Sequence, residues 1–183
     1  MREQTYTAQQ RHYMEEALFE AEQAAVIGEV PIGAVIVHNG QIIGRGHNLR
    51  EHGHDATLHA EIRAIEEACA TLQSWRLNDC QLYVTIEPCL MCSGAIINAR
   101  IPEVFYGARD PKAGAVDSLY ATLTDSRLNH TVAVHEGLLA KDAGERMVAF
   151  FKAARRRQKA AKKARKAAQV NAPDKLLDST KKS

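Results

Sequence analysis

The sequence of 183 residues contains no apolar run long enough to span a bilayer, so a membrane protein is not expected. Its first residues, Met-Arg-Glu-Gln-Thr, also lack the apolar stretch of a secretory signal. Cysteine is scarce, and four free-looking cysteines suit a reducing interior. We therefore expect a cytoplasmic protein without a membrane partner.

Internal repeats are absent as well, which leaves a compact domain as the simplest organisation. The length suits one domain, and a hydrophobic content of 45% is enough for a sizeable core. We expect the folded domain to cover residues 1–157. A basic tail should follow over residues 158–183, helical at first and then disordered.

The net charge of +2 conceals two regions of opposite sign. Residues 1–151 hold 12 Lys and Arg against 20 Asp and Glu, a net charge of −8. Residues 152–183 hold 12 Lys and Arg against 2 Asp, a net charge of +10. A basic tail on an acidic body indicates a polyanionic partner. The alternative, which a charge run alone favours, is a solvated and poorly ordered end.

Two short motifs carry groups suited to chemistry, His59-Ala60-Glu61 and Pro88-Cys89-Leu90-Met91-Cys92. In a chain of this composition His-x-Glu is expected about 0.6 times by chance, but Pro-Cys-x-x-Cys only roughly 0.002 times. The cysteine motif is therefore the more specific of the two, and the histidine motif completes the site.

Together the motifs offer three zinc ligands, His59, Cys89 and Cys92. Three protein ligands leave the fourth tetrahedral position open to water, as in catalytic zinc sites. Glu61 can then move protons to and from that water. The alternatives are two buried cysteines or half of a structural zinc site. A structural site needs a fourth ligand, and the sequence has no second Cys-x-x-Cys.

Hydrophobic periodicity predicts a three-layer α/β/α domain with a five-stranded mixed sheet. Asn39-Gly40 predicts a tight hairpin turn, and crossover helices predict parallel pairing for the later strands. The expected strands are 32–38, 41–46, 81–86, 104–108 and 131–136. The expected helices are 7–27, 58–72, a cysteine helix ending near 99, a short helix at 118–123, and a helix from about 140.

These elements place both motifs at helix N-termini. Cys89 and Cys92 are three residues apart, so both thiols face the same side of a first helical turn. The positive end of a helix lowers thiol pKa values and favours thiolates. Taken alone, a histidine at a helix start such as His59 is more often a cap or a surface residue.

The combination of His-x-Glu with Pro-Cys-x-x-Cys resembles the cytidine/nucleoside deaminase superfamily. Residues from about Tyr13 to Arg155 look like the bacterial tRNA-specific adenosine deaminases of TadA type. The stretches that carry this resemblance are Glu29 to Val35, Gly46-His47-Asn48, His59 to Ile62, Leu82 to Cys89, Tyr106 to Asp110 and Leu128-Asn129-His130.

The resemblance implies a cytidine-deaminase-like fold and conversion of the wobble adenosine of a tRNA anticodon loop to inosine. It implies one Zn²⁺ per subunit on His59, Cys89 and Cys92, a zinc hydroxide that attacks adenine C6, and Glu61 as proton shuttle. A homodimer is also implied, with Ile96 and Ile97 as candidate interface residues.

Four residues match positions at which the family contacts the anticodon loop: Asn48, Asp110, Asn129 and Phe150. Each also has a structural interpretation. Asn48 and Asp110 suit turns, Asn129 suits a strand start, and Phe150 suits a core aromatic.

Two segments depart from the family. The loop at residues 50–55 is richer in His and charge, and the tail after about Arg157 is longer than the shared core. The sequence leaves two rival functions open. One is a deaminase of a free base or nucleoside, such as guanine, cytosine or cytidine. The other is a zinc-stabilised RNA-binding module without catalysis.

Overall fold

The protein is described here by a computed structural model that covers residues 5–170, with side chains to residue 166. The chain divides into two compact units, Met1–Val148 and Ala149–Ser183. The helices are α1 (Ala8–Val26), α2 (Ala60–Leu72), α3 (Leu90–Asn98), the 3-10 helix η1 (Thr122–Thr124) and α4 (Ala140–Val170). The strands are β1 (Gly33–His38), β2 (Gln41–His47), β3 (Cys80–Ile86), β4 (Glu103–Ala108) and β5 (Ala133–Glu136).

The five strands form one mixed sheet in the order β2-β1-β3-β4-β5. Strand β1 pairs antiparallel with both β2 and β3, whereas β3, β4 and β5 run parallel to one another. The β1–β2 turn has Asn39 at φ 50° and Gly40 at φ 77°, the positive angles that a tight two-residue hairpin turn requires. The predicted five-stranded mixed sheet and its hairpin are confirmed.

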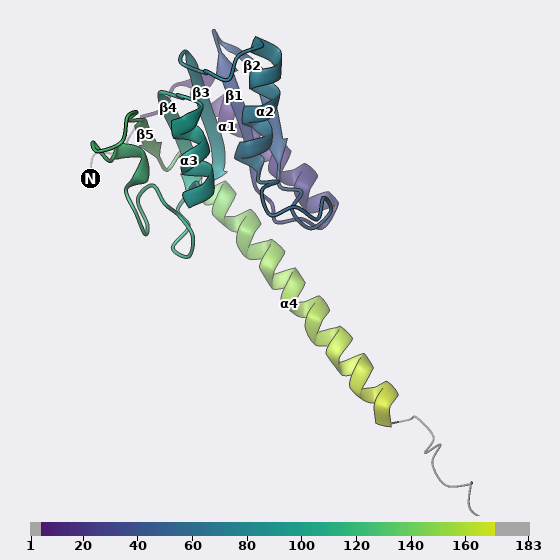
Figure 1. Ribbon diagram of the computed structural model, residues 1–183. Coiled ribbons are helices and arrows are strands. Elements are labelled where there is room, and N and C mark those ends of the chain that lie inside the picture. The colour runs from purple at the N-terminus through teal and green to yellow at the C-terminus, as the bar shows by residue number, and fades with distance from the viewer. Residues whose placement is uncertain (1–4, 171–183) are drawn as a thin grey trace, which may run out of the picture. The chain divides into compact units, whose positions relative to one another are not determined.

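Helices cover both faces of the sheet (Figure 1). Alanines of α2 and isoleucines of α3 pack on one face with Ile36, Leu82 and Val104. On the other face, Tyr13 and Met14 of α1 pack with Tyr83 and Phe105. The alternation of side chains along β3, with Leu82 on one face and Tyr83 on the other, gives the sheet two apolar faces. This is the predicted three-layer α/β/α arrangement.

Small residues let α2 lie very close to β2. A Cβ atom added to Gly44 would lie 2.2 Å from the carbonyl oxygen of Ala64, and one added to Gly46 would lie 2.2 Å from that of Ala60. No side chain fits between these backbones. The close approach sets the start of α2, and with it His59, beside the end of β2.

The first helix shows how local sequence sets an element. Thr7 and Gln10 form the predicted capping box, in which each side chain accepts a hydrogen bond from the backbone N–H of the other residue. Gly28, just past the helix end, has a φ of 86°, the conformation common after a helix C-terminus.

The short helix predicted at residues 118–123 is wrong. The structure has turns up to Ser118 and only the 3-10 helix η1 at Thr122–Thr124. The reason is tertiary: the backbone N–H groups of Val116, Asp117 and Ser118 donate to the carboxylate of Glu87. The chain then turns back, and Thr122 N–H donates to the carbonyl of Ala115.

The last helix, α4, begins in the first unit and continues through residue 170 in the second. Its first turn packs Ala143 against Leu18 and Ile86. The disorder predicted for the end of the tail concerns residues 171–183, which lie outside the described residues. Across residues 5–170, no helix combines the length and apolar content that a bilayer crossing requires.

Candidate metal centre

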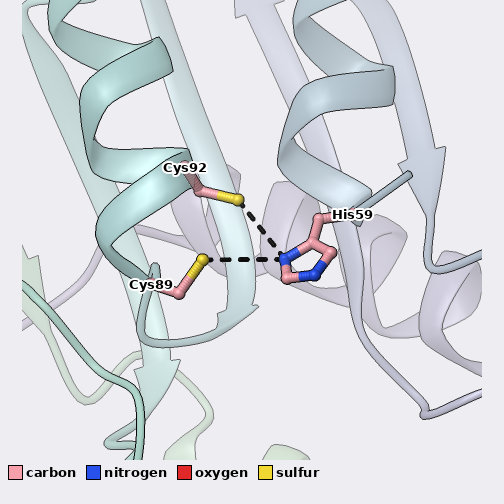
Figure 2. A group of neighbouring side chains, drawn as sticks. All are labelled: His59, Cys89 and Cys92. Carbon is pink, nitrogen blue, oxygen red and sulfur yellow. Dashed lines mark hydrogen bonds between the residues drawn. The ribbon is translucent and has the colours of Figure 1, made fainter. Parts of the chain in front are cut away.

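Three side chains that can bind a metal meet between the starts of α2 and α3. The ligand atoms of His59, Cys89 and Cys92 all lie within 4.8 Å of one another. His59 Nδ1 is 3.6 Å from Cys89 Sγ and 3.6 Å from Cys92 Sγ. Figure 2 shows both sulfur atoms and the imidazole nitrogen directed at a common point. Cys92 is fully buried, and the other two residues are half-buried.

The donor set and its spacing fit a tetrahedral zinc ion. Typical bond lengths of about 2.3 Å to sulfur and about 2.0 Å to nitrogen place the two ligand atoms roughly 3.6 Å apart at a tetrahedral angle. Two thiolates and one imidazole leave one of four positions for a non-protein ligand. The group can therefore hold a metal and keep a coordination position open.

Local helix geometry presents these side chains. His59 is the N-cap of α2 and Cys89 is the N-cap of α3, yet neither makes a side-chain capping hydrogen bond. His59 thus occupies the N-cap position, but its side chain does not cap the helix by a hydrogen bond, so the interpretation of this side chain as a cap is wrong. Both side chains extend from the positive ends of their helices, where the backbone favours bound anionic ligands.

The two thiols of this group shift each other's pKa values in opposite directions. A hydrogen bond from Cys92 lowers the pKa of Cys89 to about 4, while that same bond to Cys89 raises the pKa of Cys92 far above its usual value. The bond with Cys89 also raises the pKa of His59. Only a cation bound between the sulfur atoms would favour thiolate at both cysteines.

Glu61 lies in the first turn of α2 and is only 4% exposed. Burial raises its pKa to about 7, and the nearby Cys89 adds to the rise. A carboxyl group in this state can both accept and release a proton near neutral pH. Glu61 is thus suited to proton transfer beside the metal-binding group.

Asn48 follows β2 directly and is buried at 5% exposure. Its side-chain Nδ2 donates to Glu29 Oε2 at 2.9 Å, so the amide orientation is fixed. Gly46, two residues earlier, lies against Ala60 next to His59. The next residue, Leu49, donates its backbone N–H to the carbonyl of Leu58 at 3.0 Å, so the segment that follows Asn48 pairs with the residue before His59.

The histidine-rich loop is anchored to the same buried acid. His52 donates its backbone N–H to Glu29 Oε1 at 2.7 Å, and its Nδ1 lies 3.0 Å from that oxygen. Burial raises the pKa of Glu29, but the hydrogen bonds from His52 outweigh burial and leave the pKa below its ordinary value. Glu29 thus connects Asn48 to the loop at residues 50–55.

Asp110 begins a loop that reaches the cysteine motif. Its Oδ1 accepts hydrogen bonds from the backbone N–H groups of Lys112 (2.9 Å) and Ala113 (3.3 Å), as a turn former does. Gly114 of this loop forms an isolated antiparallel bridge with Cys89. The loop that carries Asp110 is therefore adjacent to a candidate metal ligand.

The remaining predicted contacts are Asn129 in the first unit and Phe150 in the second. Asn129 is exposed and accepts a hydrogen bond from Arg100 Nη1 at 3.2 Å. Arg100 follows the C-terminal end of α3, about 13 Å along that helix from the cysteines. Phe150 belongs to the second unit, where it makes an edge-to-face contact with Phe151. Within this chain, Asn129 is not brought to the metal-binding group, and its RNA contact stays a prediction.

Ile96 and Ile97 were expected at a dimer interface, but they are core residues. Their exposed fractions are 0% and 8%, and both pack in the cluster beneath α2 and α3. Both side chains serve the interior of one chain, although the resemblance had suggested an interface. A dimer would have to use other residues.

Two buried acids were missed as functional candidates, Glu29 and Glu87. Glutamate is rarely buried unless it is paired, so nothing in a sequence pattern marks these two as interior residues. The available signal was position: Glu87 directly precedes Pro88-Cys89, and Glu29 precedes the first strand.

The sequence of this chain is similar to those of known deaminases. The family model of MafB19-like deaminases matches residues 8–155. A tRNA-specific adenosine deaminase of Streptococcus pyogenes serotype M1 is 57% identical over 154 residues, which cover 84% of this chain and 90% of the relative. The enzyme of the same name from Bacillus subtilis strain 168 is 48% identical over 151 residues, 82% of this chain and 94% of the relative.

A solved structure is similar as well. It comes from a study of A-to-I editing by tRNA:A34 deaminases at the wobble position of transfer RNA. It superposes with a TM-score of 0.71 at 45% identity, and the match covers 74% of this chain and 98% of that chain.

Proposed function

This chain belongs to the tRNA-specific adenosine deaminase family and matches the MafB19-like deaminase model, and from that premise we propose that it converts the wobble adenosine of a tRNA anticodon loop to inosine. The reaction is hydrolytic: water oxygen adds at adenine C6, the C6–N6 bond breaks, and nitrogen leaves as ammonia. The observation that carries the proposal is the grouping of His59, Cys89 and Cys92 with the buried Glu61.

Zinc is the metal we assign to the His59, Cys89 and Cys92 group. Thiolate and imidazole donors suit zinc, and their spacing fits tetrahedral coordination. When bound, zinc supplies a Lewis acid that lowers the pKa of a coordinated water toward neutrality. The three residues would hold this cation, and Cys92 would do so from a fully buried position.

Glu61 acts as the proton shuttle. Its carboxylate accepts a proton from water as the nucleophile forms, delivers it to the adenine ring, and then assists the departure of ammonia. Burial raises the pKa of Glu61 above its ordinary value, which favours a carboxyl group that is protonated and deprotonated in turn. A residue with an ordinary glutamate pKa would be almost entirely deprotonated near neutral pH.

Asn48 and Asp110 are proposed to contact the RNA close to the reacting base, and Asn129 and Phe150 are proposed as contacts to the rest of the anticodon loop. An anticodon loop is single-stranded, so the base can leave its stack at lower cost than in a duplex. The hydrogen bond from Asn48 to Glu29 leaves the amide oxygen of Asn48 in a defined orientation for a partner. This supports recognition by a fixed polar group.

The wider assignments follow from the same premise. We propose a cytoplasmic homodimer that acts on tRNA, with residues 1–157 as the deaminase domain and residues 158–183 as a basic tail. Residues 152–166 carry 9 Lys and Arg and no acid, and all of these cations are exposed. Such a segment suits contacts with tRNA phosphates.

A paired measurement tests the proposed function. The purified protein is incubated with an anticodon stem-loop that has adenosine at the wobble position, and separately with guanine, cytosine, cytidine and adenosine. Mass spectrometry of the native protein measures bound metal in parallel. We expect one zinc per chain and inosine at the wobble position. Deamination of a free base or nucleoside without reaction of the RNA would overturn the proposal in favour of a small-molecule deaminase.

A further inference from the structure

Glu87 has an unusual number of hydrogen-bond donors around its carboxylate. Its Oε1 accepts from the backbone N–H groups of Val116 (3.1 Å), Asp117 (2.8 Å) and Ser118 (2.8 Å). Its Oε2 accepts from the backbone N–H of Asp110 at 3.0 Å and from the hydroxyl of Ser118. The residue is only 3% exposed. Burial removes water from the carboxylate at a high cost in free energy. These hydrogen bonds compensate for that cost.

All five hydrogen bonds reach one loop, residues 110–118. The hydrogen bonds hold both ends of the loop, at Asp110 and at residues 116–118. Tyr106 reinforces the second end, because its hydroxyl donates to Asp117 Oδ2 at 2.6 Å. One side chain therefore fixes the separation between the two ends of the loop.

The loop is also bound to the segment that carries the cysteines. Ala115 N–H donates to the carbonyl of Pro88 at 2.8 Å, and Gly114 pairs with Cys89 in a β-bridge. Glu87 itself is joined to the end of β4 by a hydrogen bond from its backbone N–H to the carbonyl of Ala108. The loop and the candidate ligand Cys89 therefore hold a single relative position.

The loop sequence accommodates this carboxylate at Gly114. A Cβ atom added there would lie 2.3 Å from both Cδ and Oε2 of Glu87. Gly114 does not have a positive φ, so its backbone conformation is open to other residues. The glycine therefore provides space for Glu87 rather than a special backbone angle.

We propose that Glu87 is a positioning residue for the RNA substrate, which clamps the loop at residues 110–118 against the cysteine motif so that Asp110 meets the anticodon loop at a fixed distance from the metal. The inference rests on the proposed function, because it takes Asp110 as an RNA contact. It assigns Glu87 an effect on RNA binding rather than on proton transfer.

Replacement of Glu87 by glutamine should break the hydrogen bond to one end of the loop and keep those to the other end. In Glu87→Gln, the amide oxygen can still accept from residues 116–118, but its NH₂ group then faces the N–H of Asp110, and two donors oppose each other. The opposite orientation is worse, since three N–H groups would face the NH₂. The variant should therefore release Asp110 and keep the other end of the loop. Glu20→Gln is the matched control, because Glu20 of α1 is also buried, at 8% exposure, but pairs with Arg45 and His47 of β2.

Gly114→Ala disturbs the same clamp from the loop side, because its methyl group displaces the Glu87 carboxylate. Steady-state kinetics on the wobble-adenosine stem-loop are measured for both variants, their combination and the control. Bound zinc and amide hydrogen exchange of residues 110–118 are measured on the same samples. We expect each single variant to raise KM about tenfold, the effect of roughly one lost charge-assisted hydrogen bond. Zinc content and kcat should stay within about twofold of wild type, and the double variant should cost less than the product of the single effects.

The readouts separate the possible outcomes. Faster exchange at Asp110 with a raised KM supports the proposal. Unchanged exchange and KM in Glu87→Gln would overturn it, and so would zinc loss with a reduced kcat at unchanged KM, because Glu87 would then serve the metal ligands. Absence of deamination by the wild-type protein would overturn the proposed function instead, and the exchange measurement would still decide whether the clamp exists.

Discussion

The metal-binding group and the basic helical segment use opposite physical strategies. The ligand atoms of His59, Cys89 and Cys92 come from two helix starts and all lie within 4.8 Å of one another, and the buried Glu61 belongs to the first turn of one of these helices. The cations of residues 152–166 repeat along one exposed helix and have no acid among them. In the first region the position of each atom decides function, whereas in the second the number of charges decides it. A single substitution in the metal-binding group should therefore abolish or greatly reduce activity. Each substitution in the basic segment should weaken tRNA binding by a small amount.

The largest expected effect is that of Cys92→Ser. A serine hydroxyl is a poor zinc ligand, and Cys92 is fully buried among the donors. We expect loss of bound zinc and of detectable deamination, measured by native mass spectrometry and by inosine formation. Cys69→Ser is the control, since Cys69 lies outside the metal-binding group and should keep both properties. Full activity of the metal-free protein would refute the assignment.

Glu61→Gln should reduce kcat by about 10²–10⁴-fold, the usual contribution of general acid–base catalysis. Glutamine keeps the shape of the side chain but cannot transfer the proton. Zinc content and affinity for the stem-loop should remain near wild type, which separates this variant from Cys92→Ser. Normal turnover in this variant would contradict the assignment of Glu61 as the proton shuttle.

The basic segment should show graded effects. Replacement of Lys159, Lys162 and Lys163 by glutamine should raise KM for full-length tRNA while kcat stays unchanged. The slope of log affinity against log salt should fall by up to about 0.7–0.9 for each lost phosphate contact. Truncation after Arg157 should flatten the salt dependence further.

The control for the basic segment is Lys141→Gln, because Lys141 is exposed on the same helix beside the acid Glu145. It should leave the slope unchanged. If all these variants share the wild-type affinity and salt slope, the segment is a solvated helix without a role in RNA binding.

The smallest expected effect is that of His52→Ala. The variant removes the side-chain hydrogen bond to Glu29 but keeps the backbone one, so we expect a loss of about 1 kcal/mol or less at pH 7. Because the pKa of Glu29 is lowered on folding, its stabilising effect is present above the ordinary value of 4.5 and is lost as the pH falls through the folded value. Urea unfolding at pH 7 and at pH 3 should therefore show the difference between variant and wild type shrink in acid. An equal difference at both values would contradict the role of Glu29.

Elements set by neighbours in the chain were predictable. The capping box of α1 and the Asn39-Gly40 turn depend on hydrogen bonds and φ angles within a few residues. The exception is the segment at 118–123, where helical composition was overruled by hydrogen bonds to Glu87, about 30 residues earlier in the chain. Local propensity contains no information about such a partner.

The candidate metal centre likewise has features that the sequence predicted and features that depend on tertiary packing. The identity of the ligands followed from the motifs, because zinc chemistry restricts both residue type and spacing. The distance of 3.6 Å between His59 and each cysteine depends on α2 lying close to β2, which small residues such as Gly44 and Gly46 permit. Asn129 shows the limit, since its match to the family motif did not reveal that it pairs with Arg100 at the far end of α3.

The sequence by itself determined which chemical groups this protein has: three candidate metal ligands, one acid and a separated basic segment are all properties of residue type and spacing. Only the tertiary structure decided the surroundings that give these groups their properties. Burial raises the pKa of Glu61, Glu29 holds Asn48, and Glu87 holds the loop beside Cys89. The physical reason is that desolvation and hydrogen bonding depend on which distant segments exclude water from a side chain, and that is fixed only when the sheet and its helices pack together.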